Sequence, residues 1–502
     1  MGVRGTAKCW GAPKDGDRNG ASMVLPDVGG EAVGVSHCRW IVRRIAVAAA
    51  LATTSLGAGT LRAETIGGAL VKAYFANPDI NQQRAAVRAS DENVPKATSG
   101  YRPTVTAQGQ ASIQQEDFYG PQPPLGAGAR DIFSKPRGYG LTVNQTLWNG
   151  DRTFNSVRQA ESGVMATREQ LRNTEQNVLL DGVTFYMNVL RDTAILSLDR
   201  NNVEVLQEQL RQTKDRFTVG EVTRTDVAQA EASLAGAQAT ALSAQSTLQT
   251  SIANYRQTIG DEPKNLAPVK ALEKPLPRTL ADAVAISQVE HPAIVGSLHG
   301  VDAAELNVKV IEGALYPTVG LTGQILQQFD VTGDALPNRA LTASLMGQIT
   351  VPIYDGGVTY ASTRQAKEQL GQQELQTDLQ RDRVRAAVVS AWGLNSNSVG
   401  IIRSAKAQVA AAEIALAGIR EEAKVGQRTT FDVLTAQQTL LNARVQLVSA
   451  QHDQVVASYA VMSAIGRLST VNLGLAATQY DPKVHFNQVK DKWFGLRTPD
   501  GR

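Results

Sequence analysis

Apolar residues recur every seven positions in two long stretches of the chain. The first stretch contains Val189, Leu196, Val203, Leu210 and Phe217, and the second contains Ile402, Val409 and Leu416. This spacing is typical of helices that pack against one another in coiled coils. Residues 151–217 contain no proline, and a continuous helix of that length would be about 100 Å long. The pattern therefore predicts unusually long, paired helices.

Four shorter stretches alternate apolar and polar residues with a period of two, at about 104–113, 139–148, 319–325 and 341–351. One face of each would be apolar, and the other would carry Thr, Ser, Gln and Asn. Such alternation over about ten residues is typical of a strand in a membrane barrel, with lipid outside and water inside. The chain is thus predicted to be mainly α with four amphipathic strands. Residues 116–136 and 329–338 are predicted to be exposed loops.

The two halves of the chain repeat each other. Val219–Gly220 returns 206 positions later as Val425–Gly426, and Asn149–Gly150 returns at the same spacing as Asp355–Gly356. We interpret each copy as a long helical hairpin that reverses at Gly220 or Gly426, because glycine enters left-handed conformations at little cost. The sequence therefore predicts a tandem-repeat fold of long α-helical coiled-coil hairpins.

A threonine and an aspartate follow each reversal, Thr223 and Asp226 in the first copy and Thr429 and Asp432 in the second. Threonine suits the N-cap of the returning helix. Aspartate three residues later suits the positively polarised first turn. Each reversal is therefore predicted to end in a well-defined helix start.

Proline and glycine mark the junctions between helix and strand. Pro103 and Pro317 stand where helix gives way to strand, because proline stops a helix. Gly150 and Gly356 stand where strand returns to helix.

The chain is expected to have five segments: an N-terminal extension and secretory signal (1–63), a first structural repeat (64–260), a proline-rich linker (261–278), a second structural repeat (279–470) and a C-terminal tail (471–502). Cleavage of the signal is expected after Ala63. Both cysteines, Cys9 and Cys38, lie in the first segment, so the exported chain is expected to contain none.

Composition narrows the function. The formal net charge of +3 over 502 residues gives no reason to expect nucleic-acid binding. No phosphate-binding loop, nucleophile elbow or paired metal motif is present. We therefore expect no enzyme, catalytic residue, metal or cofactor. The four histidines outside the first segment are interpreted as surface residues: His291, His299, His452 and His485.

Four strands cannot close a barrel. An open sheet in lipid leaves unpaired backbone groups at both edges, at a cost of several kcal/mol each. Two copies would give a barrel filled by its own side chains, whereas three would give twelve strands around an opening. A homotrimer is therefore predicted.

On these features, residues 64–470 resemble the TolC family of outer-membrane export ducts. The likeness covers the tandem repeat, both strand pairs, the Pro and Gly junctions and both Val-Gly turns. It implies a trimer with a twelve-stranded outer-membrane β-barrel and a periplasmic α-helical barrel. It also implies partners, namely a periplasmic adaptor (membrane fusion) protein and an inner-membrane ABC or RND transporter. The implied function is the exit duct of a tripartite efflux or type I secretion system, passing drugs or secreted proteins.

The resemblance further implies a gate at the periplasmic ends of the helices. Asp432 matches the family's aspartate ring at the narrowest point. Arg428 matches the arginine of the same turn, and Thr225 and Asp226 match its partners on the neighbouring first turn.

Two departures from the family weaken this expected gate, because Ala423 replaces a latching tyrosine and Thr435 replaces a second aspartate. Simpler interpretations also remain open. Asp226 and Asp432 could serve only as helix-start residues, and Arg428 could be a solvated surface charge. For the whole chain, the alternative function is a structural or adhesive trimeric coiled-coil stalk of the cell envelope.

Overall fold

The computed structural model describes residues 63–118, 130–272, 276–330 and 339–501. The predicted signal region up to residue 62, with both cysteines, lies outside the described residues. Most of the two predicted loops lies outside them as well. The described residues belong to one compact unit, Ala63–Arg502.

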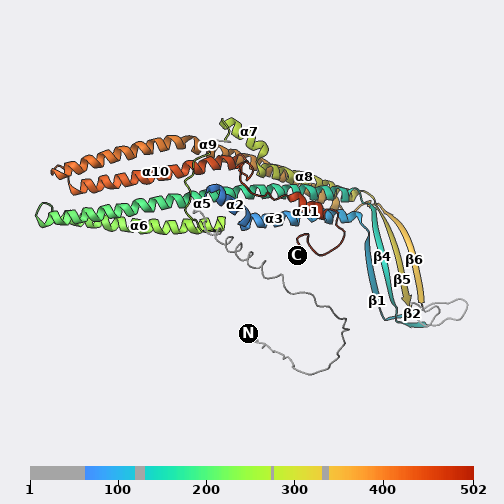
Figure 1. The fold of residues 1–502 in the computed structure, drawn as a ribbon. Helices are drawn as coiled ribbons and strands as arrows, with labels where there is room; N and C mark the ends of the chain where they lie inside the picture. Colours follow the sequence, from blue (N-terminus) through green and yellow to red (C-terminus); the bar gives the residue numbers. More distant parts are fainter. Residues whose placement is uncertain (1–62, 119–129, 273–275, 331–338, 502) are drawn as a thin grey trace, which may run out of the picture. The chain divides into compact units, whose positions relative to one another are not determined.

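Two helical hairpins dominate this unit (Figure 1). The outgoing helices are α5 (Arg152–Thr218) and α9 (Val358–Lys424), each 67 residues long. The returning helices are α6 (Arg224–Ile259) and α10 (Thr430–Ala464). Helix α10 contacts both α9 and α5, so the hairpins lie side by side. The prediction of long, paired helices is confirmed.

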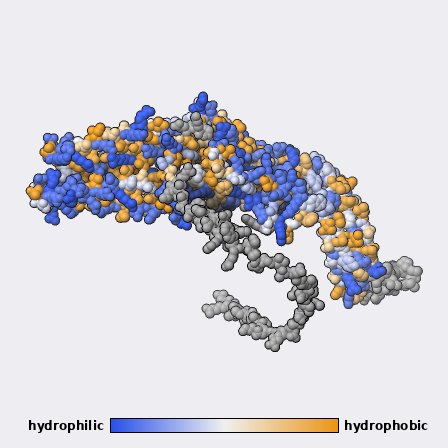
Figure 2. All heavy atoms as spheres, viewed as in Figure 1, coloured by the Kyte–Doolittle hydropathy of each residue, from blue (hydrophilic) through white to orange (hydrophobic). Residues whose placement is uncertain are grey.

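Four strands form one antiparallel sheet in the order β1-β4-β5-β6. They are β1 (Thr104–Ala111), β4 (Arg137–Trp148), β5 (Thr318–Phe329) and β6 (Arg339–Thr350). The four predicted strands are thus confirmed, and the register keeps the alternation in phase. One row across the sheet is Val105, Val143, Gly323 and Leu345, and a row on the opposite face is Thr106, Thr142, Gln324 and Ser344. Figure 2 shows hydrophobic residues over much of the visible face of the sheet.

The prediction of a loop over 116–136 is wrong at both of its ends. Strands β2 (Gln114–Phe118) and β3 (Arg130–Ser134) pair antiparallel there. The backbone of Ser112 donates to the carbonyl of Pro136, which carries the strand pairing past the end of β1. The residues of β2 are nearly all polar, so no apolar alternation revealed it. Likewise Phe329, placed in the second loop, belongs to β5 and pairs with Arg339.

Short helices precede the first strand of each half. Before β1 lie α2 (Ile66–Ala76), α3 (Pro78–Asp91) and α4 (Asn93–Thr98), and before β5 lie α7 (Leu280–Glu290) and α8 (Pro292–Glu312). They end in the single 3-10 turns η1 (Ser99–Tyr101) and η2 (Gly313–Leu315). The main hydrophobic core forms where short helices pack on the long ones. Its fully buried side chains include Leu70, Ile80, Leu179, Tyr186, Tyr255, Ile294 and Met462.

The tail contains a further helix, α11 (Pro482–Val489), which packs against α3. The sequence of this segment has no seven-residue or two-residue pattern that would predict the helix. Two of the histidines interpreted as surface residues are also misplaced: His485 in this helix and His452 in α10 are both buried.

The seven-residue pattern is present, but its most buried phase differs from the predicted one. Val189 and Leu196 are buried, whereas Phe217 is 43% exposed. The continuous buried series in α9 is Thr377, Val384, Ala391, Ser398, Ala405 and Ala412. The corresponding series in α5 is Leu171, Val178, Asp192, Asp199, Leu206 and Thr213, with the half-buried Phe185 between. A seam of Ala, Ser and Thr does not stand out in a search for apolar residues.

Candidate functional site

The two hairpin turns share one backbone geometry. Gly220 has φ +80° and Gly426 has φ +78°. A β-carbon added at either glycine would meet nothing within 4 Å, so the conformation rather than crowding favours glycine. The amide of Gly220 donates to the carbonyl of Phe217, and that of Gly426 donates to Ala423. Both outgoing helices therefore end in the same left-handed turn.

A reciprocal capping box starts each returning helix. In the first, the Thr223 hydroxyl accepts from the Asp226 amide at 3.3 Å, and Asp226 Oδ2 accepts from the Thr223 amide at 2.9 Å. In the second, the same bonds between Thr429 and Asp432 measure 3.2 and 3.0 Å. Both aspartates therefore serve as helix-start residues. Among the described residues, the hydrogen bonds of both carboxylates use only Oδ2, which leaves Oδ1 available to a further partner.

The capping bonds keep both aspartates ionised. The hydroxyl and amide of Thr223 lower the pKa of Asp226, and the amide and hydroxyl of Thr429 lower the pKa of Asp432. Because the folded pKa is lowered, the stabilisation is fully present above the ordinary aspartate pKa of about 3.9. It is lost only as the pH falls through the lowered value.

Arg428 is bonded within its own turn. Its Nε donates to Glu422 Oε2 at 2.8 Å, and this carboxylate raises the pKa of Arg428. The first turn has an ion pair of its own, in which Arg216, at the place of Glu422, bonds to Glu221 at 2.9 Å. Among the described residues, no hydrogen bond or ion pair joins Arg428 to Thr225 or Asp226, so a single chain does not assemble the predicted latch.

Ala423 and Thr435, the two positions that depart from the family, make only local hydrogen bonds among the described residues: the carbonyl of Ala423 accepts from the amide of Gly426. Thr435 directs its hydroxyl to the carbonyl of Phe431 at 2.9 Å. Phe431 itself is exposed, as are Val219 and Val425 beside the two glycines. Exposed apolar residues at both turns were not predicted as part of the site, although Val219 and Val425 were visible in the repeat.

A groove of about 380 Å³ lies behind the turns, between α5, α6 and α10. Asp199 lines it together with the amides of Asn202, Gln229 and Gln437. Burial raises the pKa of Asp199. Sequence reasoning missed this residue, which occupies the buried seven-residue series of α5.

The four junction residues lie at the end of the sheet where the strands connect to the helices. Pro103 and Pro317 directly precede β1 and β5. Gly150 and Gly356 have φ +67° and +74° after β4 and β6. A β-carbon on Gly150 would lie 2.3 Å from the carbonyl oxygen of Gly313. Here the two halves of the chain touch backbone to backbone, so only glycine fits.

Within the described residues, none of the helices combines the length and the apolar character needed to cross a bilayer. In the same part of the chain, no group of three or more His, Cys, Asp or Glu side chains is arranged to hold a metal ion.

Comparison with known proteins gives a consistent result. The sequence pattern of the family described as "Outer membrane efflux protein" matches residues 69–261 and 285–467. The chain is 44% identical to the outer membrane efflux protein BepC of Brucella suis over 458 residues, which is 91% of this chain and 97% of BepC. It is 24% identical to TolC of Escherichia coli, covering 82% and 84% of the two chains. The CmeC outer membrane channel of Campylobacter jejuni has a similar fold, with a TM-score of 0.73 at 17% identity over 85% of this chain and 89% of that one.

Paired long hairpins joined to an amphipathic sheet define the class of outer-membrane exit channels, and the predicted TolC-like character is confirmed. The chain belongs to the outer membrane efflux protein family. Its place is the outer membrane, from which the family extends into the periplasm. Members of the family are channel proteins rather than enzymes.

Proposed function

We propose that three copies of this chain form a passive exit duct across the outer membrane and periplasm. A periplasmic adaptor and an inner-membrane transporter of the ABC or RND class would feed it. BepC is named an efflux protein, which favours drugs as the cargo of this chain. The resemblance to the TolC family makes secreted proteins a second class of cargo. The duct itself performs no chemistry and needs no cofactor. In this proposal residues 64–260 and 279–470 are the two repeats, joined by the linker 261–278 and followed by the periplasmic tail 471–502.

The observation that carries the proposal is the open sheet. Within the part of the chain that the structure describes, strands β1 and β6 each pair on one side only. The apolar face includes exposed Val105, Leu141 and Leu345, and this face suits lipid. Free edges in lipid would each leave several unpaired backbone groups. Joining β6 of one copy to β1 of the next removes these edges, and three sheets give twelve strands around a polar lumen.

The same reasoning extends to the gate. We propose that in the closed trimer Arg428 exchanges its bond to Glu422 for Thr225 and Asp226 of a neighbouring first turn. Exposed ion pairs contribute little, so this exchange is easy in both directions. An engaged adaptor could then reverse it and widen the ring formed by three copies of Asp432.

Bilayer conductance of the purified protein tests the duct. We expect ion current from the wild type and a larger current from Arg428→Ala. Arg216→Ala is the control, because it breaks the ion pair within the first turn and should leave the current unchanged. Equal effects of the two variants would refute the proposed latch. Asp432→Asn should weaken the preference for cations, whereas Asp302→Asn, on α8, should not.

The second candidate is the structural or adhesive stalk, because helices packed along seven-residue seams would be enough to build one. It predicts no current from any variant. That result, obtained with protein shown to be trimeric, would replace the duct by the stalk.

A further inference from the structure

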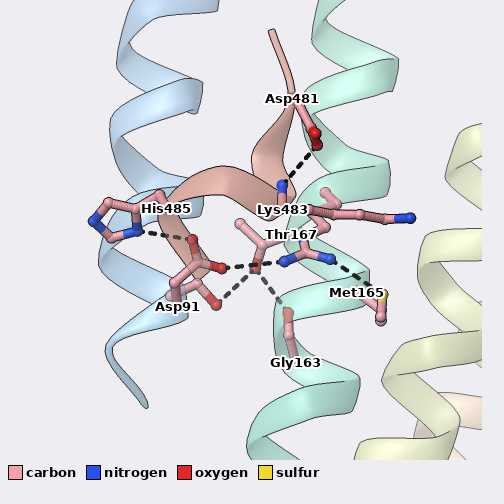
Figure 3. A network of polar contacts seen from close by, with 9 residues as sticks. Asp91, Gly163, Met165, Thr167, Asp481, Lys483 and His485 are labelled. Atoms are coloured by element: carbon pink, nitrogen blue, oxygen red, sulfur yellow. Dashed lines mark hydrogen bonds and ion pairs between the residues drawn. The ribbon is translucent and has the colours of Figure 1, made fainter. Parts of the chain in front are cut away.

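The C-terminal tail is fastened to α2 and α3. The backbone amide of Tyr480 donates to the hydroxyl of Tyr74 at 3.1 Å. Further along, His485 Nδ1 lies 2.9 Å from a carboxylate oxygen of Asp91, which is fully buried. Figure 3 shows these two side chains pointing toward one another from adjacent helices. The path of the tail is therefore fixed by specific contacts.

A second layer of contacts strengthens this attachment. Arg168 on α5 lies 3.5 Å from the other oxygen of Asp91 and stacks on the ring of Phe486 at 5.1 Å. One buried carboxylate thus joins α3, α5 and α11. The histidine that the sequence suggested was on the surface is part of this junction.

The tail reaches the start of the sheet. Arg102 precedes Pro103 and stands two positions before β1. Its Nη1 donates to the carbonyl of Lys492 at 2.8 Å, and its guanidinium lies 4.8 Å from the ring centre of Trp493. We call residues 490–497 the C-terminal apex, because the chain turns here and Asp500 then returns to pair with Arg88 on α3.

The C-terminal apex presents apolar side chains to the outside. Trp493 is 66% exposed, Phe494 is 90% exposed and Leu496 is fully exposed. Within this turn, Lys492 Nζ donates to the carbonyl of Arg497 at 2.6 Å. Three large apolar residues held outward on one defined turn are characteristic of a binding surface.

Neighbouring residues indicate which surface is bound. Exposed aromatic residues also occur where helix meets strand in both halves of the chain: Tyr101, Trp148, Tyr316 and Tyr354. Aromatic side chains at the ends of membrane strands are typical of the lipid headgroup level. The apex also carries Lys490, Lys492 and Arg497 against the single acid Asp491, a balance that suits anionic phospholipid headgroups.

We propose that the C-terminal apex binds the periplasmic surface of the outer membrane, with Trp493, Phe494 and Leu496 in the headgroup region. This surface continues the aromatic level at the ends of the strands. The inference rests on the proposed placement of the sheet in lipid. It gives the tail a function, which is to brace the helices α3 and α5 against the membrane at the base of the barrel.

Spin labelling of the full chain in phospholipid nanodiscs tests this inference. A nitroxide is attached at Phe494→Cys, with Cys9 and Cys38 replaced by serine if the purified chain retains them. Val484→Cys is the matched control, because Val484 is also exposed but lies on α11, earlier in the same tail. Leu345→Cys on β6 reports on the sheet. Accessibility is measured to oxygen, which concentrates in lipid, and to a water-soluble nickel chelate.

We expect the ratio of oxygen to nickel accessibility at 494 to exceed that at 484 several-fold. Equal ratios at the two positions would overturn the inference. So would a label at 494 that is shielded from both reagents, because another protein surface would then cover the apex. A water-accessible label at 345 would instead overturn the placement of the sheet. The two failures are therefore distinguishable.

Discussion

The two hairpins have the same turn but different bodies. Their capping boxes match bond for bond, and their glycines differ by 2° in φ, +80° against +78°. Their returning helices are unlike: fourteen of 35 residues are buried in α10, whereas five of 36 are buried in α6. The second hairpin also has a hydrophobic cluster of its own, around Leu416 and Leu440.

The two hairpins share what local backbone geometry determines and differ in what packing determines. The turn is set by local backbone geometry, which is the same wherever the hairpin lies. Packing depends on neighbours: α10 lies between α9 and α5, whereas α6 packs chiefly on α5. Much of α6 is exposed Ala, Ser, Thr and Gln. In the proposed trimer this helix faces a second copy, for which small side chains permit close approach.

The largest expected effect concerns the base of the first hairpin. Tyr186 is fully buried, and its hydroxyl oxygen lies 2.7 Å from the carbonyl oxygen of Glu64 and 2.8 Å from that of Ala267, which share its single proton. Tyr186→Ala should cost about 3–5 kcal/mol of unfolding free energy. Trp392 occupies the matching place in the second copy but is only partly buried. Trp392→Ala should therefore cost clearly less, as measured by denaturant unfolding. Equal costs would show that the two bases are packed alike.

A smaller effect is expected in the bodies of the hairpins. Leu440 lies in the cluster of the second hairpin, and Leu440→Ala should cost about 2–5 kcal/mol. Its counterpart Leu234 is half-buried, so Leu234→Ala should cost less than half as much. Hydrogen exchange of the hairpin amides measures both locally. If Leu234→Ala proved the more costly, the comparison of the two bodies would have to be reversed.

The smallest effect should be equal in the two copies. Gly220→Ala and Gly426→Ala place a β-carbon in left-handed backbone, at about 1–2 kcal/mol each. Gly418 lies within α9, with open space around it. Gly418→Ala should instead stabilise by about 0.5–1 kcal/mol. Local hydrogen exchange near the turns distinguishes the signs, and unequal costs at 220 and 426 would contradict the shared geometry.

Sequence periodicity was sufficient for the long helices, the four strands and the paired turns, because each follows from a local pattern. It failed where structure depends on distant partners. Helix α11 is held by Asp91 and Arg168, which lie more than three hundred residues away in the chain. The buried seam of Ala405 and Ala412 was missed because burial of small residues depends on how closely the neighbouring helix approaches.

The candidate site was predictable to the same extent. The positions of Asp226 and Asp432 at helix starts followed from spacing alone. The pairing of Arg428 did not, because Glu422 competes for it within the turn. The contacts of Arg428 with a neighbouring chain were open to inference only through the resemblance, and they remain a prediction.

The contact of Gly150 with Gly313 has a mechanical consequence. The backbone that follows β4 lies directly against the backbone that precedes β5, with no glycine side chain to separate the two halves of the chain. Three such rigid contacts would form a collar around the duct. In the proposed duct, we expect such a collar to resist motion that starts at the far tips, so the barrel would stay sealed against lipid while the distant end opens and closes.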